Sequence, residues 1–221
     1  MAAATEKAYI GMGMEGAVAR WYEKTTRRDM EEFRRLAARL STMLPGGGDV
    51  LEVAPGPGFL AVELAKVRGL RVSGVDVSRT MVELAQKNAK EAGVRPDIRL
   101  GSASKMPFAS ETFDLLVCRA AFKNFAQPAE ALKEMRRVLR PGGRAIIIDL
   151  RRDVSMEEID RYVRGLGLGI FSRWTTSLTF RFMLLKRAYT VAGFRELLKR
   201  VEFASAEIVP NEIGMEIRLE R

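Results

Sequence analysis

A carboxylate and two glycines lie close together near the start of the chain, in the stretch VLEVAPGPGFLAVELA. The acid is Glu52, and Gly56 and Gly58 follow it in a turn that also holds two prolines. Glycines let a ligand approach the backbone closely. A second acid, Asp76, comes 24 residues after Glu52, the usual spacing for a carboxylate that accepts hydrogen bonds from a ribose diol. Together these residues indicate a site for a ligand that carries a ribose.

The charge of Glu52 discriminates between two such ligands. The turn fits the dinucleotide pattern G-x-G-x-x-A, in which a pyrophosphate lies over the helix N-terminus. A carboxylate at that point would meet like charge, whereas it would attract a cation by about 4 kcal/mol at ~4 Å and an effective dielectric of ~20, before desolvation. S-adenosylmethionine (SAM) has an ammonium and a sulfonium in place of the pyrophosphate. Asp76 fits either ligand, and Glu52 favours SAM.

The composition excludes several kinds of chemistry. The chain has 221 residues and contains no histidine, which is the commonest general base near neutral pH and the commonest metal ligand. We therefore expect neither a metal site nor a histidine-based triad. The single cysteine, Cys118, excludes an internal disulfide framework and is typical of small core filler at the end of an apolar strand. The net charge of +9 is that of a solvated basic surface or of a protein that attracts anions.

Alternating strands and helices must position the two acids. This alternation predicts an α/β fold: a Rossmann-like, doubly wound, mostly parallel sheet of seven strands with a C-terminal antiparallel hairpin. Ser78 and Thr190 are expected to cap helices. The expected strands before the hairpin are Val50–Val53, Arg71–Val75, Asp97–Leu100, Phe113–Cys118 and Arg144–Leu150, and the expected helices span 14–44, 58–67, 79–91, 120–125 and 128–139.

We expect a single domain over residues 1–221 with four parts. A helical cap spans 1–47, and its helix stops at Pro45. The ligand-binding core spans 48–150, and a final helix and hairpin span 189–221. Between them, residues 151–188 form an insertion rich in arginine, aromatic residues and methionine. This insertion is interpreted as a lid over the domain, a pocket for an aromatic or lipophilic acceptor, or a face for a membrane or RNA.

The sequence resembles the class I SAM-dependent methyltransferases, and within them it is most similar to the small-molecule and quinone-type branch. Five segments of residues 48–150 carry the resemblance in order: VLEVAPGPG, GVDVS, GSASKMPF, FDLLVCRAAF and VLRPGGRAIII. A single glycine motif would be weak, whereas five motifs in this order are a specific signal. The resemblance implies that SAM is the methyl donor and S-adenosylhomocysteine (SAH) the product.

The resemblance also implies which residues contact the cofactor. Two positions depart from the family pattern: Ala54 replaces the first glycine, and Ser102 replaces an acid beside the adenine. Pro55 predicts an extended conformation for Ala54, and the Ser102 hydroxyl can still accept a hydrogen bond. The implied cofactor contacts are Glu52, Ala54, Gly56, Gly58, Asp76, Val77, Met81, Ser102, Ala103, Cys118, Arg119 and Tyr22.

The acceptor is expected above the cofactor, enclosed by the N-terminal segment and the insertion. Methyl transfer from a sulfonium needs alignment more than a strong base, so the residues leave the acceptor atom open among O, N, S and C. Lys123 also follows the fourth expected strand and could face the acceptor. The catalytic candidates are Tyr22, Tyr9, Glu15, Asn124, Asp149 and Arg151.

The sequence therefore predicts a cytoplasmic SAM-dependent methyltransferase that acts on a small molecule, as a monomer or homodimer. We expect no nucleic-acid partner and at most peripheral membrane contact, since no apolar run is long enough to span a bilayer. Two alternatives stay open at this point. One is an NAD(P)-dependent oxidoreductase, and the other is a non-catalytic module that binds SAM or RNA.

Overall fold

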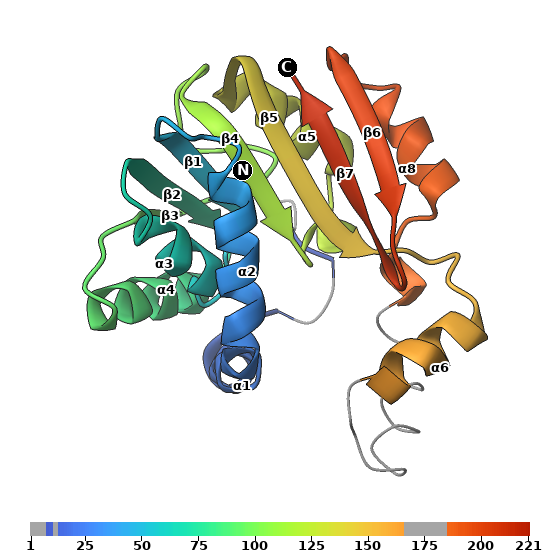
Figure 1. Ribbon diagram of the computed structural model, residues 1–221, viewed down its shortest axis with the longest axis horizontal. Helices are drawn as coiled ribbons and strands as arrows, with labels where there is room; N and C mark the ends of the chain where they lie inside the picture. Colours follow the sequence, from blue (N-terminus) through green and yellow to red (C-terminus); the bar gives the residue numbers. More distant parts are fainter. Residues whose placement is uncertain (1–7, 11–12, 166–184) are drawn as a thin grey trace, which may run out of the picture.

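A single mixed β-sheet forms the centre of the molecule (Figure 1). The computed structural model describes residues 8–10, 13–165 and 185–221, and within them the sheet has seven strands in the order β3-β2-β1-β4-β5-β7-β6. β7 runs antiparallel to both of its neighbours, which confirms the predicted fold class. The strands are β1 (Gly48–Val53), β2 (Leu70–Asp76), β3 (Asp97–Leu100), β4 (Phe113–Arg119), β5 (Leu139–Leu150), β6 (Ser205–Pro210) and β7 (Gly214–Glu220).

Helices cover both faces of this sheet because consecutive residues of its central strands are apolar and point to opposite faces. Val50 of β1 packs with α2 and α3 on one face, and its neighbour Leu51 packs with α5 and α8 on the other. Ser78 and Thr190 cap α4 and α8 as predicted. The helices are α1 (Gly16–Thr26), α2 (Met30–Ser41), α3 (Phe59–Ala65), α4 (Arg79–Glu91), α5 (Pro128–Val138), α6 (Met156–Gly165) and α8 (Val191–Leu198), with short 3₁₀ turns η1 (Arg27–Asp29), η2 (Phe122–Asn124) and η4 (Leu185–Arg187).

The point where the strand order reverses lies between β1 and β4. The chain moves outward from β1 through β2 to β3 and then returns to form β4 on the other side of β1. In open sheets of this kind, the helices that follow such neighbouring strands diverge and leave a crevice beyond the carboxyl ends of the strands. Glu52, near the end of β1, pairs with Gly74 of β2 and Val117 of β4, so it stands at this reversal.

The single helix predicted over residues 14–44 is wrong, because the segment folds as two helices with different partners. Ala19 of α1 packs on Met81 of α4, whereas Leu36 of α2 packs on the sheet. The chain must change direction between them, and the turn η1 does so. Arg27 fixes this turn: its guanidinium donates to Asn88 at 2.8 Å.

The turn before the fifth strand also differs from the prediction. β5 begins at Leu139, before Pro141, rather than at Arg144. Leu139 pairs with Phe113 and Arg144 with Leu115, so the residues between them bulge out opposite one residue of β4. The glycine-rich turn therefore interrupts a strand instead of preceding one.

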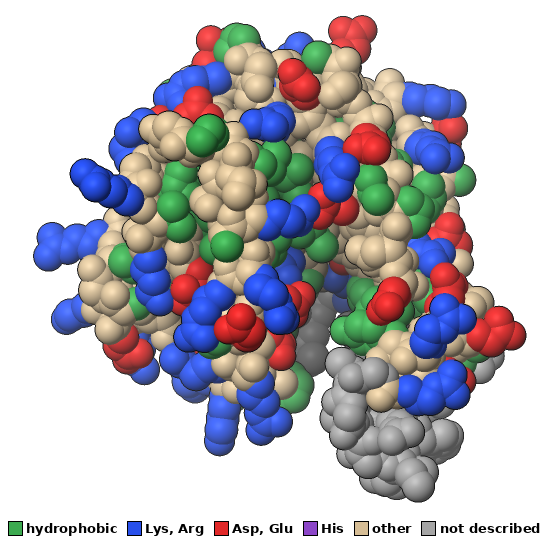
Figure 2. Space-filling view, in the orientation of Figure 1, with side chains coloured by type: hydrophobic (Ala, Val, Ile, Leu, Met, Phe, Trp, Pro, Cys, Tyr) green, Lys and Arg blue, Asp and Glu red, His purple; other side chains and the backbone are tan. Residues whose placement is uncertain are grey.

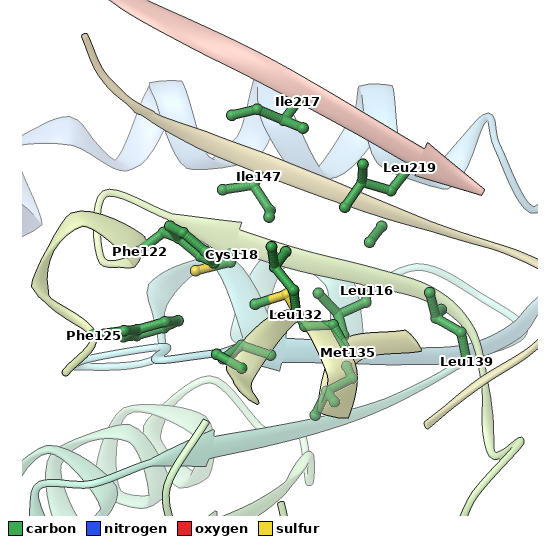
Figure 3. Packing of buried hydrophobic residues seen from close by; sticks show 14 of the residues in the cluster. Leu116, Cys118, Phe122, Phe125, Leu132, Met135, Leu139, Ile147, Ile217 and Leu219 are labelled. Carbon is green, nitrogen blue, oxygen red and sulfur yellow. The ribbon is translucent and has the colours of Figure 1, made fainter. Parts of the chain in front are cut away.

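Cys118 lies inside the core that the sheet shares with α5 and α8 (Figure 3). Its side chain is fully buried beside Phe122 and Leu132, and burial raises the pKa of its thiol well above the usual value. The interpretation of Cys118 as core filler agrees with this position. A thiol held neutral in this way is a poor nucleophile.

The predicted insertion over residues 151–188 is described only at its two ends. Ile159 and Val163 of α6 are buried against Leu185 of η4. Most of the aromatic and basic residues on which the lid and pocket interpretations rest lie in 166–184, outside the described residues. No helix among the described residues is long and apolar enough to cross a membrane.

Candidate functional site

The glycine turn joins β1 to α3 at the carboxyl end of the sheet (Figure 1). Gly56 and Gly58 have φ angles of 55° and 77°, in the left-handed region that favours glycine. A Cβ on Gly58 would come within 2.7 Å of the Cβ of Ala85, so this glycine lets α4 pack against the turn. A Cβ on Gly56 would meet, among the described residues, only the ring of Tyr22 at 3.9 Å. The backbone at Gly56 is therefore open to a ligand, with Tyr22 above it.

The prediction that Ala54 is extended is wrong. Its φ angle is 58°, because its N–H still donates to the carbonyl of Val75 at 2.8 Å and the chain must turn immediately afterwards. A left-handed conformation costs a residue with a Cβ roughly 1–2 kcal/mol. Ala54 therefore adopts, at a cost in strain, the left-handed conformation that a glycine would adopt freely. The surrounding strand pairing maintains this conformation.

Asp76 ends β2 with its carboxylate fixed by the neighbouring backbone. Its Oδ2 accepts the N–H of Gly56 at 3.0 Å, and its Oδ1 accepts the N–H of Ser78 at 2.9 Å. Burial raises the pKa of Asp76, and these two hydrogen bonds oppose that effect. Each oxygen keeps a further lone pair, so the carboxylate can accept hydrogen bonds from a diol while it holds the glycine turn.

Glu52 is buried without a full set of hydrogen-bond partners. Its side chain is 4% exposed, and its Oε2 has no hydrogen-bond partner among the described residues. Desolvation raises the pKa of this carboxyl to about 8, while a backbone hydrogen bond from Ala61 and the charge of Arg119 oppose the rise. An unpaired buried carboxyl of this kind is costly unless a cation or donor reaches it.

Four further residues predicted to contact the cofactor follow the ends of β2 and β3. Val77 is 45% exposed, which is unusual for an apolar side chain beside a buried acid. Ser102 shares a 2.9 Å hydrogen bond with the hydroxyl of Ser104, and Ala103 packs against the core beside it. Met81 is only 2% exposed and packs beneath α1, so its side chain belongs to a small core rather than to an open cofactor surface.

Glu15, a predicted catalytic candidate, has a structural role in fastening two helices. Its carboxylate accepts the N–H groups of Arg79 and Thr80 at 3.0 and 3.1 Å, and also the Thr80 hydroxyl. Hydrogen bonding by Thr80 lowers the pKa of Glu15. These N–H groups open α4, where the helix dipole stabilises a negative charge. Glu15 therefore fastens the start of α1 to the start of α4, and Ser78 adds a bond to the carbonyl of Met14 at 2.6 Å.

Tyr9 brings the N-terminal segment over the carboxyl end of β4. Its backbone forms a bridge with Phe125, and the adjacent Ile10 N–H donates to the carbonyl of Asn124 at 2.8 Å. Burial raises the pKa of the Tyr9 phenol, and Arg187 counteracts this. The charges of Asp76 and Asp149 add to the rise, and Arg187 Nη1 donates to the carbonyl of Ile10 at 3.2 Å, so η4 and the N-terminal segment meet in this region.

A buried ion pair lies in the same region. Lys123 Nζ and Asp149 Oδ1 are 2.8 Å apart, with side chains 8% and 3% exposed. Asp149 also accepts the N–H groups of Lys123 and Leu150 at 2.9 and 2.8 Å. The pair joins the segments that follow β4 and β5 at the carboxyl edge, and it occupies Asp149 as an acceptor.

Two arginines that were predicted near the ligands are held by other elements. Arg151 pairs with Glu158 at 2.5 Å and donates to the carbonyl of Asn211 in the β6–β7 turn at 3.3 Å. Arg119 pairs with Glu32 at 2.8 Å and stacks over a ring of α2. Sequence reasoning gave Arg187 and Tyr189 no site role. Arg187 nevertheless donates to the carbonyl of Ile10, next to Tyr9, at 3.2 Å, and burial together with the charge of Asp149 raises the pKa of Tyr189. No local motif marks either residue, because their position depends on how η4 packs.

Comparisons with known proteins decide the family. Residues 51–147 match a family model described as a methyltransferase domain. The chain is 32% identical to a demethylmenaquinone methyltransferase from Chlorobaculum parvum over 169 residues, which cover 73% of this chain and 68% of that relative. It is 36% identical to a ubiquinone/menaquinone biosynthesis C-methyltransferase from Geotalea uraniireducens over 122 residues, 53% of this chain and 52% of the relative. The chain belongs to the class I SAM-dependent methyltransferases.

Solved structures agree with this methyltransferase fold. A SAM-dependent methyltransferase from Aquifex aeolicus superposes with a TM-score of 0.62 at 17% identity, covering 87% of this chain and 98% of that one. The plantazolicin methyltransferase BpumL, solved with SAH, superposes with a TM-score of 0.72 at 15% identity, covering 94% and 91%. The methyl donor of the present methyltransferase is SAM, and the dinucleotide-dependent oxidoreductase alternative is wrong.

The geometry of this methyltransferase fits SAM. The unpartnered Oε2 of Glu52 is a place for the cationic methionine end, and the open backbone at Gly56 allows close approach. The fixed carboxylate of Asp76 suits the ribose diol. These three assignments remain predictions, and they use the residues that the sequence singled out. The described residues include no cluster of acidic or cysteine side chains that could hold a metal ion.

Proposed function

We propose that this methyltransferase methylates the ring of a small lipophilic acceptor of the quinol type. Two relatives about one third identical to this chain are named for demethylmenaquinone and for ubiquinone/menaquinone biosynthesis. The observation that carries the proposal is a set of contacts beyond the ends of β4 and β5: Tyr9 bridges Phe125, Arg187 donates to the carbonyl of Ile10 at 3.2 Å, and Asp149 is paired with Lys123. An aromatic hydroxyl needs a hydrogen-bond donor and a compensating positive charge, and this group contains both.

Tyr9 is suited to donate a hydrogen bond rather than to remove a proton. Burial raises the pKa of its phenol above the ordinary value of 10.0, so it stays protonated near neutral pH. A neutral phenol can donate to the oxygen of an ionised acceptor. Arg187, which is exposed and acts electrostatically on Tyr9, would stabilise the negative charge on that oxygen.

The Lys123–Asp149 pair would set the shape and polarity of the floor of this region. Asp149 accepts three hydrogen bonds, one of which is the ion-pair contact with Lys123 Nζ, so it is poorly placed to act as a general base. With no histidine in the chain, the acceptor itself must supply reactivity. A quinol does so, because an ionised ring hydroxyl makes the adjacent ring carbon nucleophilic.

SAM, when bound, would supply a methyl group activated on its sulfonium, and methylation of the ring carbon would be balanced by loss of the ring proton to water. The protein's contribution is alignment. Tyr22 lies over the glycine turn and Tyr9 lies on the acceptor side, so the two rings would enclose the path between donor and acceptor. Positioning of this kind supplies a large part of the rate in displacement reactions.

The test is methyl transfer from radiolabelled SAM to a reduced naphthoquinol, run beside a catechol, an aromatic amine and an aliphatic thiol. We expect C-methylated quinol by mass spectrometry and a fall of roughly tenfold or more in kcat/KM for Tyr9→Phe. Tyr162→Phe on α6 is the matched control and should retain activity. Methylation of another acceptor class alone would overturn the proposal. Tight SAH binding without turnover of any acceptor would support the alternative of a non-catalytic SAM-binding module.

A further inference from the structure

The outer face of α1 exposes a tryptophan. Trp21 is 67% exposed, the highest exposed fraction among the large apolar side chains of the described residues. The opposite side of this helix faces the protein: Ala19, two positions earlier, is the one buried residue of α1 and packs against α4. A large aromatic side chain left in water is informative, since tryptophan is usually buried or placed at an interface.

Three cations share this face with Trp21. Arg20, Lys24 and Arg28 are four residues apart, so they follow one side of the helix and its continuation into η1. All three are exposed, and the structure gives none of them an ion pair with any described residue. Arg27 differs, because Glu23 pairs with it at 2.7 Å. We call Arg20, Trp21, Lys24 and Arg28 the basic face of α1; Figure 2 shows Lys and Arg side chains gathered around that helix.

The basic face lies on the outside of the helix that covers the cofactor turn. Tyr22, the next residue after Trp21, stands over Gly56 on the inner side. Figure 1 shows α1 beyond the carboxyl edge of the sheet, and Tyr9 bridges Phe125 in the segment that follows β4 at that edge. A surface that contacts the basic face would therefore stand beside the region where the acceptor is proposed to bind.

We propose that the basic face of α1 docks this methyltransferase on a bilayer surface that carries anionic headgroups. The inference deepens the proposed function, on which it rests, because a lipophilic acceptor would be delivered from a bilayer. The cations match the charge of such a surface, and tryptophan prefers the boundary between headgroups and hydrocarbon. Each cation near an anionic surface strengthens binding by roughly fivefold.

Charge argues against a second copy of the chain as the occupant. The chain carries a net charge of +9, and two basic faces brought together would repel each other. An RNA partner needs several aromatic platforms along a basic groove, whereas this face has one aromatic side chain on a convex helix. A second copy of the chain and an RNA would each give a distinct result in the vesicle experiment.

The experiment is co-sedimentation of the full chain with vesicles of phosphatidylcholine, with and without phosphatidylglycerol. The test variant is Arg20→Glu/Lys24→Glu/Arg28→Glu. The matched control is Arg68→Glu/Lys90→Glu/Arg95→Glu, whose three cations are exposed and lie near the starts of β2 and β3, at the opposite edge of the sheet. Both triple variants lower the net charge from +9 to +3, since each replacement removes two charges.

We expect wild type and the control to bind the anionic vesicles, the test variant to lose binding by about 100-fold or more, and salt to weaken binding. Trp21→Ala should also bind more weakly. In a Trp174→Phe background, which leaves Trp21 as the only tryptophan, the fluorescence of Trp21 should shift to the blue on anionic vesicles. Both triple variants should bind SAH with the same affinity by calorimetry. This result would establish that the two variants are folded.

Four results would overturn the inference: no vesicle binding by wild type, equal losses in both triple variants, concentration-dependent dimerisation that the test variant abolishes, or tighter binding to single-stranded RNA than to vesicles. Turnover of a detergent-solubilised quinol separates this inference from the proposed function. Turnover in detergent without vesicle binding would refute the docking face alone. Vesicle binding without turnover of any quinol would refute the acceptor and leave the docking face supported.

Discussion

Lys123 and Asp149 join the ends of two neighbouring strands through a buried ion pair 2.8 Å long. Lys123 follows β4 and Asp149 lies in β5, so the pair ties together the edge at which the acceptor is proposed to bind. Neither residue belongs to a motif with the other in sequence. Because both side chains are almost fully buried, each charge depends on its partner.

Removing one member of this pair should destabilise the protein strongly. We expect Lys123→Met to lower the free energy of unfolding by about 3–5 kcal/mol, since it leaves the Asp149 charge buried and unpaired. Urea unfolding followed by circular dichroism measures this. Lys133→Met, which breaks the exposed pair with Glu130, is the control and should change stability by less than about 1 kcal/mol. Equal effects of the two variants would contradict the burial argument.

Asp76 should contribute directly to cofactor affinity. Asp76→Asn keeps an oxygen for the N–H of Gly56 but removes the charge that strengthens a hydrogen bond from a ribose hydroxyl. We expect SAH to bind about 10- to 100-fold more weakly, equivalent to ~1.5–3 kcal/mol. Calorimetric titration gives the affinity, with Asp97→Asn, an exposed acid of β3, as the control. An unaltered affinity would show that Asp76 only supports the turn.

Glu52 should make stability depend on pH. Its pKa is raised from 4.5 to about 8 in the folded protein, so the folded state holds a proton that the unfolded chain releases between these values. Stability should therefore fall as pH rises from about 4.5 to 8, by at most ~1.4 kcal/mol per pH unit. Glu52→Gln should flatten this dependence and raise the melting temperature at pH 8 more than at pH 5. Parallel pH profiles for wild type and Glu52→Gln would argue against a buried protonated carboxyl.

The same carboxyl should couple cofactor binding to pH. A cation placed at the unpartnered Oε2 would favour the ionised form, so binding should release a proton and tighten as pH rises from 6 to 8. SAH titrations in two buffers of different ionisation enthalpy count the protons released. We expect Glu52→Gln to bind SAH more weakly and with little dependence on pH. Proton release that persists in Glu52→Gln would place its origin elsewhere.

Ala54 offers a test of strain in the glycine turn. Because its φ angle is 58°, we expect Ala54→Gly to stabilise the protein by up to ~1 kcal/mol, the strain relieved less the added entropy of the unfolded chain. Ala54→Val should be destabilising, because a β-branched side chain fits this region poorly. Thermal unfolding measures both. The reverse substitution at Gly58, Gly58→Ala, should be destabilising because its Cβ would collide with Ala85.

The sequence by itself determined the features that depend on near neighbours. The caps at Ser78 and Thr190 could be predicted because each hydroxyl meets a backbone N–H three residues later. The strand and helix order, the glycine turn and the position of Asp76 at the end of β2 could be predicted because alternation and spacing are local. The family motifs then led to the cofactor.

Only the tertiary structure decided the features that need contact between distant segments. The helix breaks at η1 because α1 and α2 pack on different partners, and the left-handed Ala54 follows from its bond to β2. Glu15 meets the start of α4 across 64 residues of chain, and Lys123 meets Asp149 across 26. A side chain's partner in such cases depends on how whole elements pack, and the local pattern of residues does not encode that choice.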